Sequence, residues 1–582
     1  MLNKTKNIRK ELNNYMKIHD ILIVGAGLTG LRAAFEGITA DLDVAVLTKV
    51  HPLRSHSCAA QGGVNAAIHE DDDWRDHAYD TVKGADFIGD EDSIELMCSE
   101  APQAVLDLDD LGCPFSRNED GSIAQRAFGG ASFARTAYAA DRTGHAMLHT
   151  LWEQAIKHGT KIYQEYHVLE IIKNKLGQAC GVIAMEIATG KLEVIRAKTV
   201  LMATGGYGRV YKANTNAMIN TGDGIALAMK AGANLGDLEF VQFHPTGLKT
   251  SGILISEGVR GEGAYLIGKD GERFMHKYAP NKLELASRDV VSRSEAMEII
   301  AGNGVDGAVF LDVRHLGKDL ILERLPQIRQ LSIDFEGVDP IDAPIPVRPT
   351  CHYTMGGIRT EKLGQTNVKG LYAAGEAACA SVHGANRLGA NSLLETIVFG
   401  KFVGKEMVRF IKEDYYHQED LTPDKEVCKQ TSEFIKGLKS KDAETGIRPA
   451  ALREKLTEAM NSYVGVFRNQ DLMQQGLEKI LEVKEEFKNV YIDDKSDCFN
   501  TDLLTTIELS NLILLAEATV RSALERKESR GAHTREEFPT RDDENYRKHT
   551  LASLNEKGEV VISYEPVRLV GNDRYKPVER VY

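Results

Sequence analysis

The fold of this chain is set by DILIVGAGLTGLRAAFEG, residues 20–37. Four β-type apolar residues, Ile21 to Val24, lead into the turn Gly25-Ala26-Gly27-Leu28-Thr29-Gly30, and a helix-favouring segment follows directly. In this order Gly25 makes the turn, Gly27 lets the backbone approach a pyrophosphate, and Gly30 allows close helix–strand packing. The helix N-terminus offers N–H groups and a positive dipole to phosphates. We therefore predict a Rossmann-type dinucleotide-binding domain here; a glycine-rich turn in an ordinary α/β protein is the alternative.

The second predicted strand, in DVAVLTKV at residues 43–50, departs from the usual pattern. An Asp or Glu that binds the ribose is expected about 20 residues beyond the first glycine. Thr48 and Lys49 stand at that place, which argues against plain NAD binding. A few residues later comes RSHSCAAQGG, residues 54–63, in which two serines flank His56. Taken alone, such a histidine is more often an ordinary polar residue.

The RSHS string resembles the flavin-attachment segment of succinate dehydrogenase and fumarate reductase flavoprotein subunits. In that family the matching histidine is covalently bonded to the flavin, so the resemblance implies FAD attached through His56. The resemblance extends over nearly the whole chain, because further strings match the family in the same order. These are QFHPTG at 242–247, SEGVRGEG at 256–263, ELASRD at 284–289, HYTMGG at 352–357 and HGANRLG at 383–389.

The resemblance implies a dicarboxylate substrate, succinate or fumarate. Planar guanidinium groups clamp carboxylates bidentately, which suits a substrate with two anionic ends. The family usually has threonine at the position of Ser256, but the hydroxyl is kept. The residues that would hold the two carboxylates are His244, Ser256, His352 and Arg387.

The resemblance also implies a proton path. Arg288 would carry the proton to or from the substrate, and Glu257 and Arg260 would relay it to solvent. An arginine side chain ordinarily stays protonated, which makes it an unusual proton carrier. The sequence therefore leaves a second reading open, in which Arg288 only stabilises negative charge and water carries the proton.

No metal site is predicted, because the eight cysteines are scattered without a C-x-x-C pair. The expected FAD site draws on segments from both halves of the chain. The expected cofactor-binding residues are Gly25, Ala26, Gly27, Leu28, Thr29, Gly30, Thr48, Lys49, Ser55, His56, Ser57, Gln61, Gly62, Gly63, Asp223, Glu376, Ser392 and Leu393.

Composition limits the possible partners. The chain has 582 residues, 42% of them hydrophobic and 27% charged, with a net charge of −14. The negative charge argues against nucleic acid as a partner. We find no run of about 18 apolar residues and no secretory signal, so no direct membrane span is expected. By resemblance, an iron–sulfur subunit and membrane anchor subunits would hold the chain on the cytoplasmic face of the cell membrane.

The expected fold class is α/β: a Rossmann-type FAD-binding domain interrupted by a capping domain, then a helical domain and a small C-terminal segment. Two later strand-to-glycine elements, at 200–206 and 370–376, indicate that the first domain is discontinuous. The predicted parts are an N-terminal tail (1–17), the FAD-binding domain (18–247 and 341–408), the capping domain (248–340), the helical domain (409–545) and the C-terminal segment (546–582).

The function implied by the resemblance is the interconversion of succinate and fumarate, with electrons passing to an iron–sulfur subunit. L-aspartate oxidase is the nearest enzymatic alternative, but it normally lacks the RSHS string. A flavin-holding assembly subunit without turnover is another, but it would need none of the substrate-binding and proton-transfer residues. Gln61 stands where some fumarate reductases carry Glu and some succinate dehydrogenases carry Gln. Succinate oxidation is therefore slightly favoured over fumarate reduction.

Overall fold

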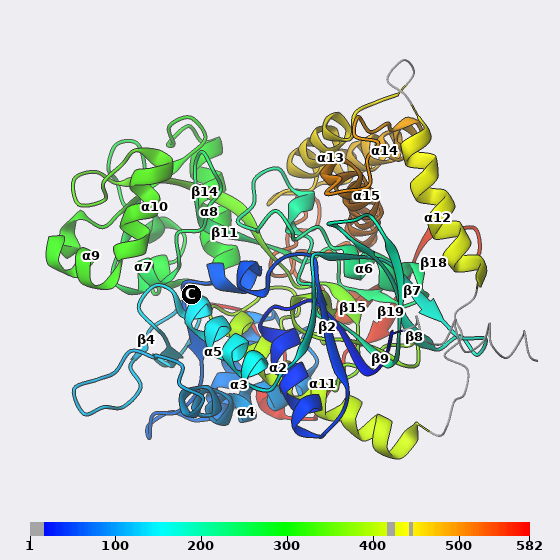
Figure 1. The fold of residues 1–582 in the computed structure, drawn as a ribbon. Helices are drawn as coiled ribbons and strands as arrows, with labels where there is room; N and C mark the ends of the chain where they lie inside the picture. The colour runs from blue at the N-terminus through cyan, green and yellow to red at the C-terminus, as the bar shows by residue number, and fades with distance from the viewer. Residues whose placement is uncertain (1–16, 416–424, 442–445, 582) are drawn as a thin grey trace, which may run out of the picture.

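The computed structural model describes residues 17–415, 425–441 and 446–581 (Figure 1). The predicted N-terminal tail lies outside these residues, except for Lys17. The described chain combines one large mixed sheet, three smaller sheets and helices that cover them.

The central sheet has seven strands in the order β6-β2-β1-β9-β8-β7, and β16 also pairs with β9. Strands β6, β2, β1, β9 and β16 are parallel, whereas β7, β8 and β9 pair antiparallel. Leu22 and Leu371 lie on opposite sides of Val200 in register, so the three strand-to-glycine elements meet in one sheet. The strands are β1 (Lys17–Val24), β2 (Val44–Thr48), β6 (Lys161–Gln164), β7 (Tyr166–Lys173), β8 (Ala179–Glu186), β9 (Leu192–Met202) and β16 (Leu371–Ala373).

Both faces of this sheet are buried, as parallel strands require. Ile21 and Ile23 of β1 pack into the apolar cluster of the helices on one face, and Leu22 and Val24 pack into the cluster on the other. The first cluster contains residues of α2 (Leu28–Thr39), α3 (Trp74–Gly84), α4 (Glu91–Asp110), α5 (Thr143–Lys157) and α11 (Asn391–Arg409). The second contains residues of α6 (Asp223–Lys230), α12 (Lys425–Ser440), α13 (Pro449–Tyr463), α14 (Gln470–Glu486) and α15 (Thr501–Glu525).

A four-stranded sheet, ordered β11-β14-β13-β12, lies to one side of the central sheet (Figure 1). It has its own apolar cluster, drawn from residues 248–347. This is the region of the predicted capping domain, although two of its strands run beyond 248–340; the domain boundaries stay a prediction. Its elements are β11 (Val241–Leu248), α7 (Gly258–Gly261), β12 (Tyr265–Ile267), α8 (Arg288–Ile300), β13 (Val309–Asp312), α9 (Lys318–Arg324), α10 (Pro326–Glu336) and β14 (Ile345–Thr354).

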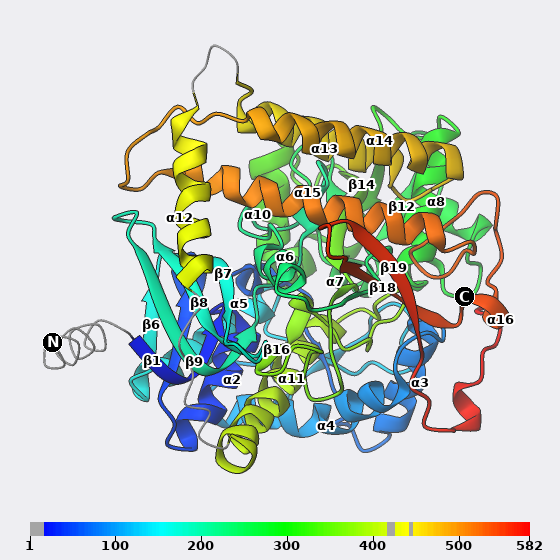
Figure 2. The ribbon, with the colours of Figure 1, turned by 90° about the vertical axis from the view of Figure 1, so that its right-hand side faces the viewer.

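The C-terminal strands close the molecule beside the helical region. Figure 2 shows α13, α14 and α15 side by side, with β18 and β19 next to α15. These strands complete a five-stranded sheet, β17-β15-β10-β18-β19. A three-stranded sheet, β3-β5-β4, contacts α11 through β3. The elements are β3 (Val64–Asn65), β4 (Gln125–Arg126), β5 (Thr136–Ala137), β10 (Leu235–Gly236), β15 (Gly357–Arg359), β17 (Ala378–Cys379), α16 (Asp543–Tyr546), β18 (Lys548–Leu554) and β19 (Val560–Pro566).

Helix α15 differs from the expectation that no segment resembles a membrane span. By length and composition alone it is apolar enough to cross a bilayer, and it is the one such helix among the described residues. However, 78% of its most apolar window is buried inside the protein. It is therefore a core helix. The sequence predicts this, because Ile507, Leu514, Leu515 and Ala518 fall roughly on one face of a helix; Leu514 is only partly buried.

Candidate cofactor and substrate site

One cavity of about 450 Å³ runs between the central sheet and the capping region. It brings together residues from positions 24 to 396. Every predicted cofactor, substrate and proton-path residue lies on its wall, except Gly30 and Arg260. Gly30 packs against the Gly25 backbone behind the cavity wall, and Arg260 lies next to Glu257.

The glycine turn after β1 is built so closely that side chains are excluded. Gly25 has φ +113°, and a Cβ atom on it would lie 2.1 Å from the carbonyl oxygen of Ala203. A Cβ atom on Gly30 would lie 1.9 Å from the carbonyl oxygen of Gly25. The first turn of α2 therefore sits directly on the turn, with its N-terminus on the cavity wall. These features fit a pyrophosphate.

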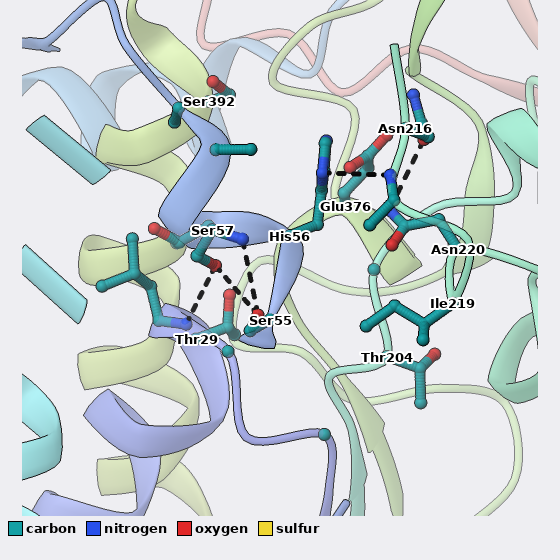
Figure 3. Close-up of a pocket in the computed structure, with 18 of the residues that line it drawn as sticks. Thr29, Ser55, His56, Ser57, Thr204, Asn216, Ile219, Asn220, Glu376 and Ser392 are labelled. Carbon is teal, nitrogen blue, oxygen red and sulfur yellow. Dashed lines mark hydrogen bonds between the residues drawn. The ribbon is translucent and has the colours of Figure 1, made fainter. Parts of the chain in front are cut away.

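Two serines of the RSHS string complete this end of the cavity (Figure 3). The Ser57 hydroxyl accepts a hydrogen bond from the Leu28 N–H at 3.2 Å. A Cβ atom on Gly27 would lie 2.9 Å from the Ser55 hydroxyl oxygen. The RSHS segment and the glycine turn, which are far from adjacent in sequence, thus form one wall.

The end of β2 has no acidic residue of its own, but two carboxylates from distant parts of the chain lie beside it. Lys49 Nζ donates to Asp223 Oδ2 at 2.9 Å and to Glu508 Oε1 at 2.6 Å. Burial alone would lower the pKa of Lys49, but the two carboxylates outweigh burial and raise it. Asp223, at the start of α6, thus stands beside the position where a ribose-binding acid is expected.

His56 is held by a residue that the sequence did not single out. Its Nδ1 accepts a hydrogen bond from the Ala217 N–H at 3.3 Å, and Figure 3 shows the side chain reaching across to that loop, next to Asn216. Burial lowers the pKa of His56 to about 4, so the ring is neutral at pH 7. With Nδ1 engaged as an acceptor, Nε2 is the nitrogen left for other chemistry.

Two histidines and an arginine meet beyond His56. The rings of His244 and His352 have their centroids 5.0 Å apart, and Arg387 Cζ lies 4.4 Å from the centroid of the Tyr353 ring. The Thr246 N–H donates to His244 Nδ1 at 3.2 Å, which leaves the proton on Nε2. Burial, together with Arg288, holds the pKa of His244 and of His352 well below the usual range.

This cluster has unused donors. Among the described residues, His244 Nε2 and Arg387 Nε are buried without a hydrogen-bond partner. Burial, reinforced by Arg288, lowers the pKa of Arg387 to about 9, so it remains a cation at pH 7. A neutral N–H donor beside a cationic guanidinium suits an anionic ligand with carboxylate groups.

Arg288 is fixed by two side chains. Its Nε donates to Glu257 Oε2 at 2.6 Å, and its Nη1 donates to Gln242 Oε1 at 3.0 Å. Burial alone would raise the pKa of Glu257, but Arg288 and Arg260 outweigh it and lower the pKa. Glu257 is therefore a buried carboxylate. Arg260 Nη2 lies 3.7 Å from the same Glu257 oxygen.

Gln61 joins the RSHS segment to the capping region. Its Nε2 donates to the Leu254 carbonyl at 3.1 Å, and its Oε1 accepts from the Ser256 N–H at 3.1 Å. The Ser256 hydroxyl accepts from the Gly258 N–H at 3.1 Å and lies on the cavity wall. Both ends of the Gln61 amide are thus used, and they require an amide rather than a carboxylate.

Glu376 also lies on the cavity wall, where its Oε1 accepts from the Thr354 N–H at 3.1 Å. Burial raises the pKa of Glu376 to about 7. Ser392 and Leu393 are in the first turn of α11, so a second helix N-terminus reaches the same cavity.

The sequence missed the loop that carries Thr215, Asn216 and Ala217. Thr215 Oγ1 lies 2.8 Å from His352 Nδ1, and Asn216 Nδ2 donates to the His352 carbonyl at 2.9 Å. The same loop therefore orients both His56 and His352. The only local signal is the polar run NTN at 214–216 after the second glycine turn. Within the described ranges, no three His, Cys, Asp or Glu side chains lie close enough together to hold a metal ion.

Comparison with known proteins agrees with this site. A family described as "FAD binding domain" matches residues 20–393, and one described as "Fumarate reductase flavoprotein C-term" matches residues 453–582. A Rickettsia conorii succinate dehydrogenase flavoprotein subunit is 47% identical, covering 97% of this chain and 98% of that protein. This chain belongs to the succinate dehydrogenase and fumarate reductase flavoprotein family.

Other similar proteins are named fumarate reductases. A Mycobacterium tuberculosis fumarate reductase flavoprotein subunit is 42% identical, covering 97% of this chain and 99% of the relative. A solved chain of a variant E. coli quinol fumarate reductase superposes with a TM-score of 0.93 at 41% identity, covering 97% of this chain and 99% of that one. The predicted fold class, FAD as cofactor and oxidoreductase activity are thereby confirmed.

Proposed function

We propose that this chain is the catalytic flavoprotein subunit of a succinate:quinone oxidoreductase, with FAD covalently attached to His56. One observation carries the proposal: a single cavity joins the pyrophosphate-type turn at Gly25, the neutral His56 and the cluster around His352 and Arg387. A dinucleotide cofactor and a small dianion would thus lie in contact.

The residues of the cluster have distinct tasks in this function. Bound FAD supplies hydride transfer, whereas the protein supplies orientation and charge. Arg387 and the His244 Nε2–H bind the substrate carboxylates, together with His352 and Ser256. Arg288 moves the proton at the substrate carbon. Glu257, as a carboxylate in contact with Arg288, passes that proton on towards Arg260.

Covalent attachment is assigned to His56 Nε2. A neutral imidazole alkylated at Nε2 keeps its lone pair on Nδ1, and that is the atom which accepts the Ala217 N–H. Acid denaturation should leave yellow, fluorescent flavin on a peptide that contains His56. Flavin released free into the supernatant would rule out the bond.

The His56→Ser variant separates attachment from binding. We expect it to retain FAD, because the turn at Gly25 and the Lys49–Asp223 pair do not depend on the bond. Succinate oxidation should fall more than fumarate reduction, since losing the bond lowers the flavin potential. Equal losses in both directions would contradict this role of the bond.

The electrons leave through partner subunits in this proposal. The chain would pass them to an iron–sulfur subunit that anchor subunits hold on the cytoplasmic face of the membrane. We expect the isolated chain to reduce artificial dyes with succinate but not quinone, and the partners to restore quinone activity. Quinone reduction by the chain alone would contradict a multisubunit enzyme.

We place the physiological direction on the side of succinate oxidation. The Gln61 amide supports this direction, because some succinate dehydrogenases carry Gln at this place. Assays of the whole complex with a high-potential and a low-potential quinone give the test. Faster fumarate reduction with the low-potential quinol than succinate oxidation with the high-potential quinone would reverse the assignment.

A further inference from the structure

A second buried acid, Glu295, lies on α8 behind the proton path. It follows Arg288 by seven residues, so the two side chains share one face of the helix about 10 Å apart. Glu295 is 0% exposed. Within the part of the chain that the structure describes, neither of its carboxyl oxygens has a hydrogen-bond partner.

Arg260 links this acid to the site. Its positive charge favours the ionised form of Glu295, and it lies 3.7 Å from Glu257, which contacts Arg288. Arg260 Nε and Nη2 are themselves buried and have no partner among the described residues. Beyond the Arg288–Glu257 pair there are thus two buried ionisable side chains with unused polar atoms, Arg260 and Glu295.

Stability does not explain Glu295. A buried polar group without a partner costs about 1–3 kcal/mol. Such groups are few in native proteins and call for a functional or structural reason. Glu298, one turn later on α8, shows the ordinary solution: the Tyr278 hydroxyl and Asn303 Nδ2 each donate to it at 2.7 Å.

We propose that Glu295 is the proton reservoir behind Arg260, so that the path runs Arg288, Glu257, Arg260, Glu295. This inference rests on the proposed succinate–fumarate function. In fumarate reduction Arg288 gives its proton to the substrate carbon and regains one from Arg260 through the Glu257 carboxylate. Glu295 then gives its carboxylic proton to Arg260, across a bridging water, and is reprotonated from solvent. Succinate oxidation moves the proton in the reverse order, and no electron enters this path.

The charges favour this sequence. Burial raises the pKa of Glu295 well above its usual range, so it rests as a neutral acid with a proton to give. The other members of the path are two guanidinium cations and a carboxylate, none of which is a ready donor at neutral pH. Once Glu295 has lost its proton, its negative charge is stabilised by Arg260.

The test compares Glu295→Gln and Glu295→Met with the matched control Glu298→Gln in the flavin-loaded full chain. We expect both Glu295 variants to lower kcat for dye-linked fumarate reduction about 10-fold with KM unchanged. Their ratio of kcat in H₂O to kcat in D₂O should rise, because reprotonation becomes slow. Glu295→Met should also raise Tm, since it removes an unpaired buried carboxyl. Glu298→Gln should lower Tm and leave kcat and the isotope ratio unchanged.

An unchanged kcat in Glu295→Gln would overturn the relay. A lower kcat without a change in the isotope ratio, or a loss of folding in both variants, would show a structural residue and overturn it too. The wild-type chain tests the proposed function separately. Absence of fumarate reduction in the wild type would reject that function, whereas a fully active Glu295→Gln variant would reject only the role of Glu295.

Discussion

The position of the Arg288 side chain depends on the shape of its guanidinium group as well as on its charge. Its Nε and Nη1 point to two different side chains, Glu257 and Gln242, and Gln242 Nε2 in turn donates to the Arg387 carbonyl at 2.8 Å. Arg288, which we propose carries the proton, and Arg387, which we propose binds the substrate, are therefore held by one shared amide. A lysine has the charge but not the planar fork that this arrangement needs.

We expect Arg288→Lys to lose turnover by about 100-fold or more while it still binds the dicarboxylate. An interaction used only in the transition state lowers kcat without raising Kd. Stopped-flow titration of the flavin spectrum with succinate gives Kd, and a dye-linked assay gives kcat. Weak binding with a preserved kcat would make Arg288 a substrate clamp instead.

At the residue scale, local rules predicted some parts of the site and not others. Gly30 follows from the turn itself, because a Cβ atom on it would meet the nearby carbonyl oxygen of Gly25. Gly25 follows from the glycine pattern of the turn, although the atom that excludes its Cβ is the distant Ala203 carbonyl oxygen. The contact of Ala217 with His56 joins segments 161 residues apart, and no local pattern signals it. Glu295 is hidden for another reason: a charged residue on a helix normally indicates a solvated face, and here it is fully buried.

At the scale of elements, the packing of α11 on α2 positions the glycine turn. A Cβ atom on Gly400 of α11 would lie 2.9 Å from the Thr29 carbonyl oxygen and 2.9 Å from Arg32 Cβ. The two helices therefore touch backbone to backbone. Because the first turns of both helices line the cavity, a shift of either one moves the cofactor site.

The Gly400→Ala substitution should destabilise the protein by about 1–3 kcal/mol through overpacking, against a gain of about 1 kcal/mol in helix propensity. We expect a lower Tm and a lower flavin content per chain. The control is Gly437→Ala in the exposed helix α12, where no described atom lies within 4 Å of the added Cβ. That change should raise Tm slightly. A Gly400→Ala protein as stable as the wild type would disprove the close packing.

The sequence predicted the elements better than their lengths. The alternating residues around 181–185 and 194–196 predict a hairpin that turns at Thr189-Gly190, and it is present as β8 and β9. The strand predicted around Val200 is the second half of the same β9. Pairing with β8, β1 and β16 carries β9 through eleven residues, and such pairing is a tertiary effect. The loop-like string Thr143-Gly144-His145 predicts a helix that begins near Ala146, whereas α5 begins at Thr143.

At the scale of the whole molecule, buried charges join the C-terminal strands to the FAD-binding region. His549 of β18 contacts Asp237 Oδ2 at 2.7 Å and Asp90 Oδ1 at 3.1 Å. Arg359 and Arg568 contact the other Asp90 oxygen at 2.8 and 3.0 Å. Burial alone would lower the pKa of His549, but the two aspartates outweigh it and raise the pKa to about 9.

This shift predicts a stability that depends on pH. The folded pKa lies above the unfolded value of about 6.5, so the stabilisation is complete below pH 6.5 and is lost as pH rises through 9. The contribution is about 3 kcal/mol. In Tm measurements from pH 6 to 10, the gap between wild type and His549→Gln should be widest at low pH and shrink by pH 9–10. A gap independent of pH would show that His549 is neutral in the folded protein.

The spread of the cavity wall along the chain, from Val24 to Thr396, also sets the order of events during synthesis. A ribosome adds the roughly 370 intervening residues in roughly 20–70 s at 5–20 residues per second. Throughout that interval the nascent chain carries its glycine turn but no closed pocket. Flavin loading therefore comes after residue 396 has been added, late in translation or in the released chain. A cell short of flavin would accumulate full-length apoprotein, a finished but empty subunit, rather than arrested fragments.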